Sequence, residues 1–308
     1  MSETTLFFGP SLKALGKAEW LEEAADIMSL NGTFAALGKK HWAAQSQGSS
    51  TLLVTFETLQ SIQHLSPLAH PLAWDIVQAE GWSQLVLISD GDTWFRDEAV
   101  FAFFDQLVDD CYFDGFEHVV FYGAGSCGYA ASAYSVAAPG ARVLAVQPQA
   151  TLDPRVTEWD PRFTEKRRLC FTDRYGYAPD MLEAASRAYI IYDPHESFDA
   201  MHAALFTRPN VSKLRLPNMG AALQVDLWQL GLLKELIDAA ARGRLTPKRF
   251  SRLARARRDH LPYLRRLLAK LDRDEREGLA QILCRNVSSR LRAPRFARRL
   301  KKAEANNS

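Results

Sequence analysis

The residues best suited to chemistry lie in one short stretch, residues 118–131, with the sequence HVVFYGAGSCGYAA. The apolar run at 119–122 has the length of a buried strand. It stops at the small residues 123–128, before an alanine-rich segment that predicts a helix. A tight strand-to-helix turn of the form small-x-Ser-x-small holds a serine hydroxyl above the end of its strand. This pattern predicts that Ser126 is a nucleophile.

The same glycines allow two other interpretations. Gly123, Gly125 and Gly128 have the G-x-G-x-x-G spacing of a dinucleotide-binding turn, which brings backbone N–H groups and a helix N-terminus to a pyrophosphate. That turn needs an acidic residue about 20 residues further on, at the end of the next strand, to bind the ribose. The next predicted strand, 142–146, ends in the sequence QPQ instead. We therefore favour the nucleophile turn and expect no cofactor, with a packing turn without chemistry as the alternative.

Strands and helices alternate along the first 240 residues. Residues 45–50 are small and polar and predict a loop, whereas 150–180 lack periodicity, as functional loops and lids often do. The alternation predicts an α/β fold with a mostly parallel, doubly wound sheet covered by helices on both faces. Apolar runs predict strands at 33–37, 51–56, 84–89, 119–122, 142–146, 188–192 and 211–216, and helical spacing predicts helices at 11–30, 97–110, 129–138, 199–206 and 223–241.

Length and composition are those of an ordinary globular protein. Of 308 residues, 47% are hydrophobic and 24% charged, which is enough to bury a full core. No apolar stretch reaches the roughly 18 residues that span a bilayer, and the N-terminus has no leader pattern, so we expect a cytoplasmic protein. The four cysteines form no C-x-x-C pair, which predicts reduced thiols and no metal site. Cys127 begins a predicted helix, where a thiol pKa can fall, but such a residue is more often a small packing side chain.

The turn and its surroundings resemble the α/β-hydrolase superfamily, in an esterase-like branch. The resemblance lies in FYGAGSCGYAA, in QPQATLDPRVTEWDPRF one strand later, and in WFR at 94–96 and YDP at 192–194, which follow two other strands. It covers residues 50–240 and is most specific at the turn, where the branch has the pattern Tyr-Gly-x-Ser-x-Gly-Gly-Tyr-Ala-Ala. It implies an α/β-hydrolase-like domain at residues 1–240.

The resemblance also implies a set of catalytic residues. The nucleophile maps to Ser126. The acid, which follows a late strand, maps to Asp193, with Asp153 as the alternative. The oxyanion hole would use the backbone N–H of Cys127 and another near Phe56, in the loop after an earlier strand.

The histidine departs from the pattern, because Ala221 stands where the resemblance predicts it. A serine hydroxyl needs a positioned base to act as a nucleophile near neutral pH. His195 and His202, near Asp193, are the candidate substitutes. Two functions follow. The chain is a serine hydrolase or acyltransferase acting on an ester of a small metabolite or carbohydrate, or it is a catalytically inactive binding or scaffold protein.

The chain from residue 241 onward differs from the rest in charge. Residues 241–308 contain 21 basic and six acidic residues, a formal charge of +15, which leaves −13 on residues 1–240. Helix-start signals at Thr246 and His260 predict amphipathic helices, so we expect a basic helical appendage at 241–308. Such a surface suits a polyanion or a protein partner. We favour docking on the acidic body of the same chain or of a partner subunit.

Overall fold

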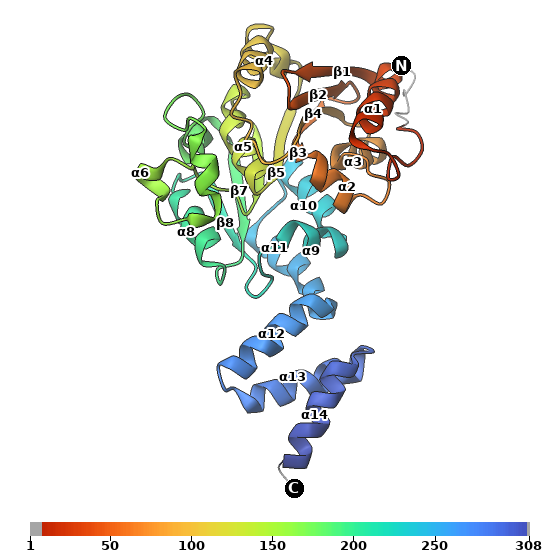
Figure 1. The fold of residues 1–308 in the computed structure, drawn as a ribbon, viewed down its shortest axis with the longest axis vertical. Helices are drawn as coiled ribbons and strands as arrows, with labels where there is room; N and C mark the ends of the chain where they lie inside the picture. Colours follow the sequence, from red (N-terminus) through yellow and green to blue (C-terminus); the bar gives the residue numbers. More distant parts are fainter. Residues whose placement is uncertain (1–7, 307–308) are drawn as a thin grey trace.

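A computed structural model describes residues 8–306 of the chain. A twisted sheet forms its centre, helices cover both faces of the sheet, and a group of helices extends from one end (Figure 1). The predicted α/β fold with a mostly parallel sheet is confirmed.

All the strands belong to one eight-stranded sheet, in the order β1-β2-β4-β3-β5-β6-β7-β8. β2 runs antiparallel to both of its neighbours, and every other pair is parallel. Parallel strands place their carboxyl ends at one edge of the sheet, where loops of α/β proteins build their sites. The strands are β1 (Gly32–Leu37), β2 (His41–Ser46), β3 (Thr51–Thr58), β4 (Ser83–Ser89), β5 (His118–Ala124), β6 (Arg142–Val146), β7 (Arg187–Tyr192) and β8 (Val211–Arg215).

The helices follow the predicted periodicity in most places. In α4, for example, the Asp97 side chain accepts a hydrogen bond at the N-terminus, and Val100, Phe101, Phe104 and Leu107 form the buried face. The helices are α1 (Lys17–Asn31), α2 (Leu59–Leu65), α3 (Leu72–Glu80), α4 (Glu98–Asp109), α5 (Ser126–Tyr134), α6 (Pro154–Thr157), α7 (Ala178–Met181), α8 (Ser197–Leu205), α9 (Leu223–Gln229), α10 (Leu232–Ala241), α11 (Pro247–Leu253), α12 (Leu261–Arg273), α13 (Glu277–Arg290) and α14 (Pro294–Asn306).

Two element predictions are wrong. The loop predicted at 45–50 begins inside β2, because pairing with β1 and β4 on both sides holds its polar sequence in a strand. The single helix predicted at 223–241 is two helices. The break falls at Gly231, whose φ of 67° ends α9 and starts α10 in a new direction.

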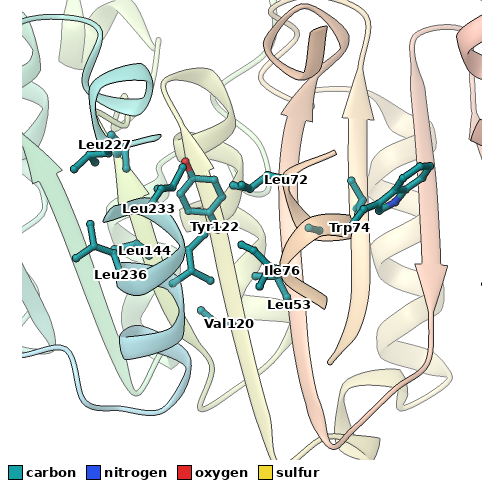
Figure 2. Packing of buried hydrophobic residues seen from close by; sticks show 14 of the residues in the cluster. Leu53, Leu72, Trp74, Ile76, Val120, Tyr122, Leu144, Leu227, Leu233 and Leu236 are labelled. Carbon is teal, nitrogen blue, oxygen red and sulfur yellow. The ribbon is translucent and has the colours of Figure 1, made fainter. Parts of the chain in front are cut away.

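Two apolar clusters, one on each face of the sheet, form the core of the body. On one face, Leu233 and Leu236 of α10 lie against Val120 and Leu144 of the central strands (Figure 2). Full burial of such side chains contributes about 1.5–3 kcal/mol each. The other face packs α4, α5 and α8 against the same strands. β5, the strand that leads into the turn with the predicted nucleophile, therefore lies between two apolar clusters and is rigidly placed.

A third apolar cluster lies apart from the sheet. It is formed by Leu264 and Leu268 of α12, by three residues of α13 and by residues just before and within α14. None of the helices within residues 8–306 has the length and apolar composition that crossing a membrane requires.

Candidate functional site

The turn between β5 and α5 has Gly125 at its apex. Its backbone angles are φ 59° and ψ −124°, and a positive φ of this kind strains any residue that carries a Cβ. Gly123 is constrained by space, because a Cβ there would lie 2.1 Å from the carbonyl oxygen of Cys127. A Cβ at Gly125 would instead meet open space. Position 125 is therefore the tip of the turn, with room for a side chain.

Ser126 comes one residue after the apex, as the first residue of α5. It is only 8% exposed, and its Oγ donates a 2.7 Å hydrogen bond to Oδ1 of Asp92, in the loop after β4. Within the described chain, no hydrogen bond joins Ser126 to a histidine. The structure thus pairs the predicted nucleophile with a carboxylate that the sequence did not indicate, and not with His195.

The backbone N–H groups of Cys127 and Phe56, the two predicted oxyanion donors, lie in different kinds of secondary structure. Cys127 lies in the first turn of α5, where N–H groups have no acceptor within the helix. Phe56 lies inside β3, in register with Leu87, so its backbone belongs to the sheet and not to the expected loop. Burial, with the carboxylates of Asp92 and Glu57 nearby, raises the pKa of the Cys127 thiol. Cys127 is therefore a buried packing residue, as the sequence favoured, and burial outweighs the effect of the helix N-terminus on its thiol.

Asp193 follows β7 and is almost fully buried. Its Oδ2 accepts a 2.7 Å hydrogen bond from the backbone N–H of Gly220, in the loop after β8. Its Oδ1 lies 3.2 Å from Nδ1 of His195. The other ring nitrogen of His195 lies 2.8 Å from Nζ of Lys270, on α12. His195 therefore connects Asp193 to α12 and not to the turn.

His202, the alternative base, and Asp153, the alternative acid, both bond to residues outside the turn. His202 is fully buried, with Nε2 3.0 Å from Asp160, and its Nδ1 accepts the backbone N–H of Ala150 at 3.1 Å. Since both nitrogens are in use, this ring has no free position for proton transfer. Asp153 accepts a hydrogen bond from the first turn of α6 and pairs with Arg155.

A pocket of about 320 Å³ lies over the turn, and we call it the elbow pocket. Gly125 and Ala221 both line it, so the apex of the turn faces the same space as the predicted histidine position. Asp193 reaches the same loop through its bond to Gly220. The other lining residues are Ala124, Gln147, Gln149, Arg162, Phe163, Asp199, Ala222, Leu223, Gln224 and Val225.

Hydrogen bonds fix the polar lining of the elbow pocket. Gln147 donates to Asp199 at 2.6 Å and accepts from the backbone N–H of Leu223 at 3.0 Å. Arg162 donates to Asp199 at 2.7 Å and, through two nitrogens, to Asp160. Burial alone would raise the pKa of Asp160, but the hydrogen bonds from Arg162 hold that pKa below its ordinary value. Two carboxylates therefore surround a single guanidinium in a preorganised lining.

Strained backbone also lies near the elbow pocket. Gln147 has φ 48°, and Trp94 and Phe95 have φ 51° and 54°. The indole N–H of Trp94 donates to Gln149 at 3.2 Å, which links this segment to the lining. Strain of this kind persists only where the surroundings enforce it, and it is common at binding sites. Within residues 8–306, no group of three or more His, Cys, Asp or Glu side chains is placed to hold a metal ion.

Strand order, the turn after β5 and the buried carboxylate of Asp193 after β7 identify the architecture. The chain has an α/β-hydrolase-type fold. No protein-family model and no curated protein sequence matches this α/β-hydrolase-type chain.

Solved structures of similar fold include enzymes. Est1E from Butyrivibrio proteoclasticus is 11% identical with a TM-score of 0.47, over 70% of this chain and 98% of that one. The capsule O-acetyltransferase of Neisseria meningitidis serogroup A is 10% identical with a TM-score of 0.44, over 68% and 98%. A glycosylation-associated protein complex from Streptococcus agalactiae is 10% identical with a TM-score of 0.41, over 63% of this chain and 43% of that one. At these values the likeness concerns the fold and carries no argument about activity.

The sequence also indicates that position 125, and not position 126, corresponds to the serine of the branch pattern. Counting from Tyr122-Gly123 along the branch pattern Tyr-Gly-x-Ser-x-Gly-Gly-Tyr-Ala-Ala places the serine of the branch at position 125. Counting back from Tyr129 gives the same result. The nucleophile was assigned to the neighbouring Ser126 because Ser126 is the only residue of the turn, 123–128, that carries a hydroxyl. Gln147 and Arg162, which fix the pocket lining, had no such signal, because their contacts join segments far apart in sequence.

Proposed function

We propose that this chain binds a small uncharged polar ligand in the elbow pocket, without forming an acyl-enzyme. The observation that carries the proposal is Gly125. The apex of the turn, which is where this fold presents a nucleophile, has the required backbone angles and room for a side chain but has no side chain.

The predicted base position supports the same proposal. Ala221 lines the elbow pocket and carries no titratable group. Asp193 occupies the acid position, yet its carboxylate is used by Gly220 and His195. The carboxylate is therefore present, but the nucleophile position is Gly125 and the base position is Ala221. Such a site has the shape of a hydrolase site without its reacting groups.

The charge of the lining indicates the class of ligand. The charged side chains that line the pocket are Arg162 and Asp199, and the guanidinium is bonded both to Asp199 and to Asp160, which is not among the lining residues, so the bonded group carries a net negative charge. An anionic ligand would face excess negative charge and a committed arginine. A neutral ligand with hydroxyl or amide groups can use the side-chain amide of Gln224, which lines the pocket.

A serine hydrolase or acyltransferase that uses Ser126, Asp193 and His195 is the competing proposal. The Asp193–His195 pair favours it. Two contacts argue against it. Ser126 Oγ donates its hydrogen bond to Asp92 at 2.7 Å, and Nε2 of His195 contacts Lys270 and not Ser126.

Ligand-observed NMR with a set of small uncharged amides and polyols tests the binding proposal. Ala222→Trp should fill the elbow pocket, since Ala222 is exposed and lines it, and binding should be lost. Ala102→Trp, at an exposed position of α4, is the matched control and should bind normally. Fragments that bind equally well to the Ala222→Trp chain would show that the pocket is not the binding site.

A further inference from the structure

Helices α12, α13 and α14, which we call the terminal unit, extend away from the sheet (Figure 1). The unit has its own apolar core, to which all three helices contribute. In the described chain, α12 and the residue before it make hydrogen bonds and ion pairs to the sheet-bearing part, and Arg290 of α13 reaches Asp259 and the carbonyl oxygen of Arg258, in the segment just before α12. Arg266 pairs with Asp226 at 2.6 Å, and Lys270 contacts His195. Of the predicted appendage at 241–308, the first part packs on the body of the same chain through Leu245, Phe250 and Ala254, and α12 adds polar contacts to it.

The positive charge is concentrated beyond α12. Residues 285–302 contain eight basic residues and no acidic one. Arg290 pairs with Asp259, and Arg299 pairs with Asp272 and Glu277. The other six are exposed and, within the described part of the chain, have no carboxylate partner. They are Arg285, Arg292, Arg295, Arg298, Lys301 and Lys302.

The helix geometry places several of these charges on one face of α14. Arg295, Arg298 and Lys302 are spaced i, i+3 and i+7 and so follow one side of the helix. Phe296 and Leu300, on the other side, contact the third apolar cluster. The core therefore fixes α14 in place and leaves its basic face outward.

We propose that the terminal unit binds double-helical nucleic acid through the phosphate backbone, with the basic face of α14 against a groove. α13 and α14 are joined by three residues, 291–293, and a short turn between two helices with a basic second helix suits this contact. A helix with its side chains is about 10–12 Å wide, close to the width of about 12 Å of the major groove.

Residue types favour this partner over other polyanions. Of the 21 basic residues from 241 onward, 17 are arginine, whose guanidinium binds phosphate through two parallel hydrogen bonds. Single strands are bound through exposed aromatic rings, but Phe296 and Phe250 are buried and Tyr263 is partly buried. A membrane surface needs a free apolar face, and that face of α14 is covered by the unit's own core.

Fluorescence anisotropy of the full chain with a labelled DNA duplex of about three helical turns tests the proposal. The logarithm of the affinity should fall linearly with the logarithm of the salt concentration. The triple variant Arg295→Gln/Arg298→Gln/Lys302→Gln should reduce the magnitude of this slope by about 2.7, since each lost phosphate contact contributes about 0.9.

A matched triple variant, Lys39→Gln/Arg168→Gln/Arg187→Gln, removes the same charge from exposed positions of the body and should leave the slope unchanged. Circular dichroism confirms that both variants fold. Absence of duplex binding, an equal loss in the two triple variants, or equal affinity for a single strand of the same length would overturn the proposal. So would binding only to vesicles of phosphatidylcholine and phosphatidylserine, or only to an acidic protein.

Discussion

At the scale of single residues, the proposed function rests on Gly125. In a hydrolase the residue at this apex is strained, and the strain is part of how its hydroxyl is exposed. Glycine adopts φ 59° without that cost. One residue therefore removes both the reacting group and the local strain, which is the combination expected of a site that binds without covalent chemistry.

Gly125→Ala tests the backbone argument. The new Cβ meets open space, so only the positive φ is unfavourable, and we expect the free energy of unfolding to fall by about 1–2 kcal/mol. Urea denaturation measures the change. Gly278→Ala, in the first turn of α13 with open space around it, is the control and should not destabilise the chain. Equal effects at the two positions would contradict the backbone assignment at Gly125.

Glu57 gives a pH dependence at the same scale. Burial raises its pKa from 4.5 to about 7, although Leu72 N–H and Thr55 Oγ donate to it at 2.9 Å. The folded chain thus holds the proton more tightly than the unfolded chain. Its contribution to stability is full below pH 4.5 and is lost as the pH rises through about 7. The loss amounts to about 3 kcal/mol.

Glu57→Gln should remove this pH dependence, because the amide cannot ionise. Urea denaturation of both proteins between pH 4 and pH 8 measures it. The native chain should lose about 3 kcal/mol more than the variant over this range. Parallel stability curves would show that Glu57 does not titrate in this way.

At the scale of elements, the sequence predicted the sheet well because central strands contain uninterrupted apolar runs, as at 85–88 and 143–146. β2 was missed because partners on both sides, and not its own residues, hold it in the sheet. The turn itself was located correctly. The sequence could not show which residue forms the apex, because Gly123, Gly125 and Gly128 are the same residue type. They differ only in backbone angle and in the space around an added Cβ.

The acid and its loop were also predicted in part. Asp193 follows a strand, as the pattern indicated, but the direction of His195 depends on α12, a helix about 75 residues further along the chain. Contacts at such separations leave no periodicity in either segment. The pocket lining was missed for the same reason.

At the scale of the whole molecule, Asp226 of α9 connects the pocket wall to the terminal unit. It is buried, and it bonds to His260 at 2.8 Å and to two nitrogens of Arg266. Gln224 and Val225, its neighbours on α9, line the elbow pocket. The two proposed binding regions therefore meet at one carboxylate.

Asp226→Asn should weaken this connection. Loss of a buried charge whose partners remain typically costs about 3–5 kcal/mol, and the partial exposure of Arg266 reduces this to about 2–3 kcal/mol. Hydrogen exchange should increase in α12. Asp272→Asn, which removes an exposed partner of Arg299, is the control and should cost less than about 1 kcal/mol. An unchanged exchange rate in α12 of the Asp226→Asn chain would mean that Asp226 does not hold the unit.

Covalent labelling shows whether the turn between β5 and α5 carries an activated nucleophile, which the proposed binding function excludes. The native chain is incubated with a fluorophosphonate, and the intact mass is measured. The Gly125→Ser/Ala221→His variant serves as a positive control, since it places a hydroxyl and an imidazole at the two vacant positions of the elbow pocket beside Asp193. We expect no adduct on the native chain. An adduct on native Ser126 that disappears in Ser126→Ala would contradict it and would establish a serine hydrolase.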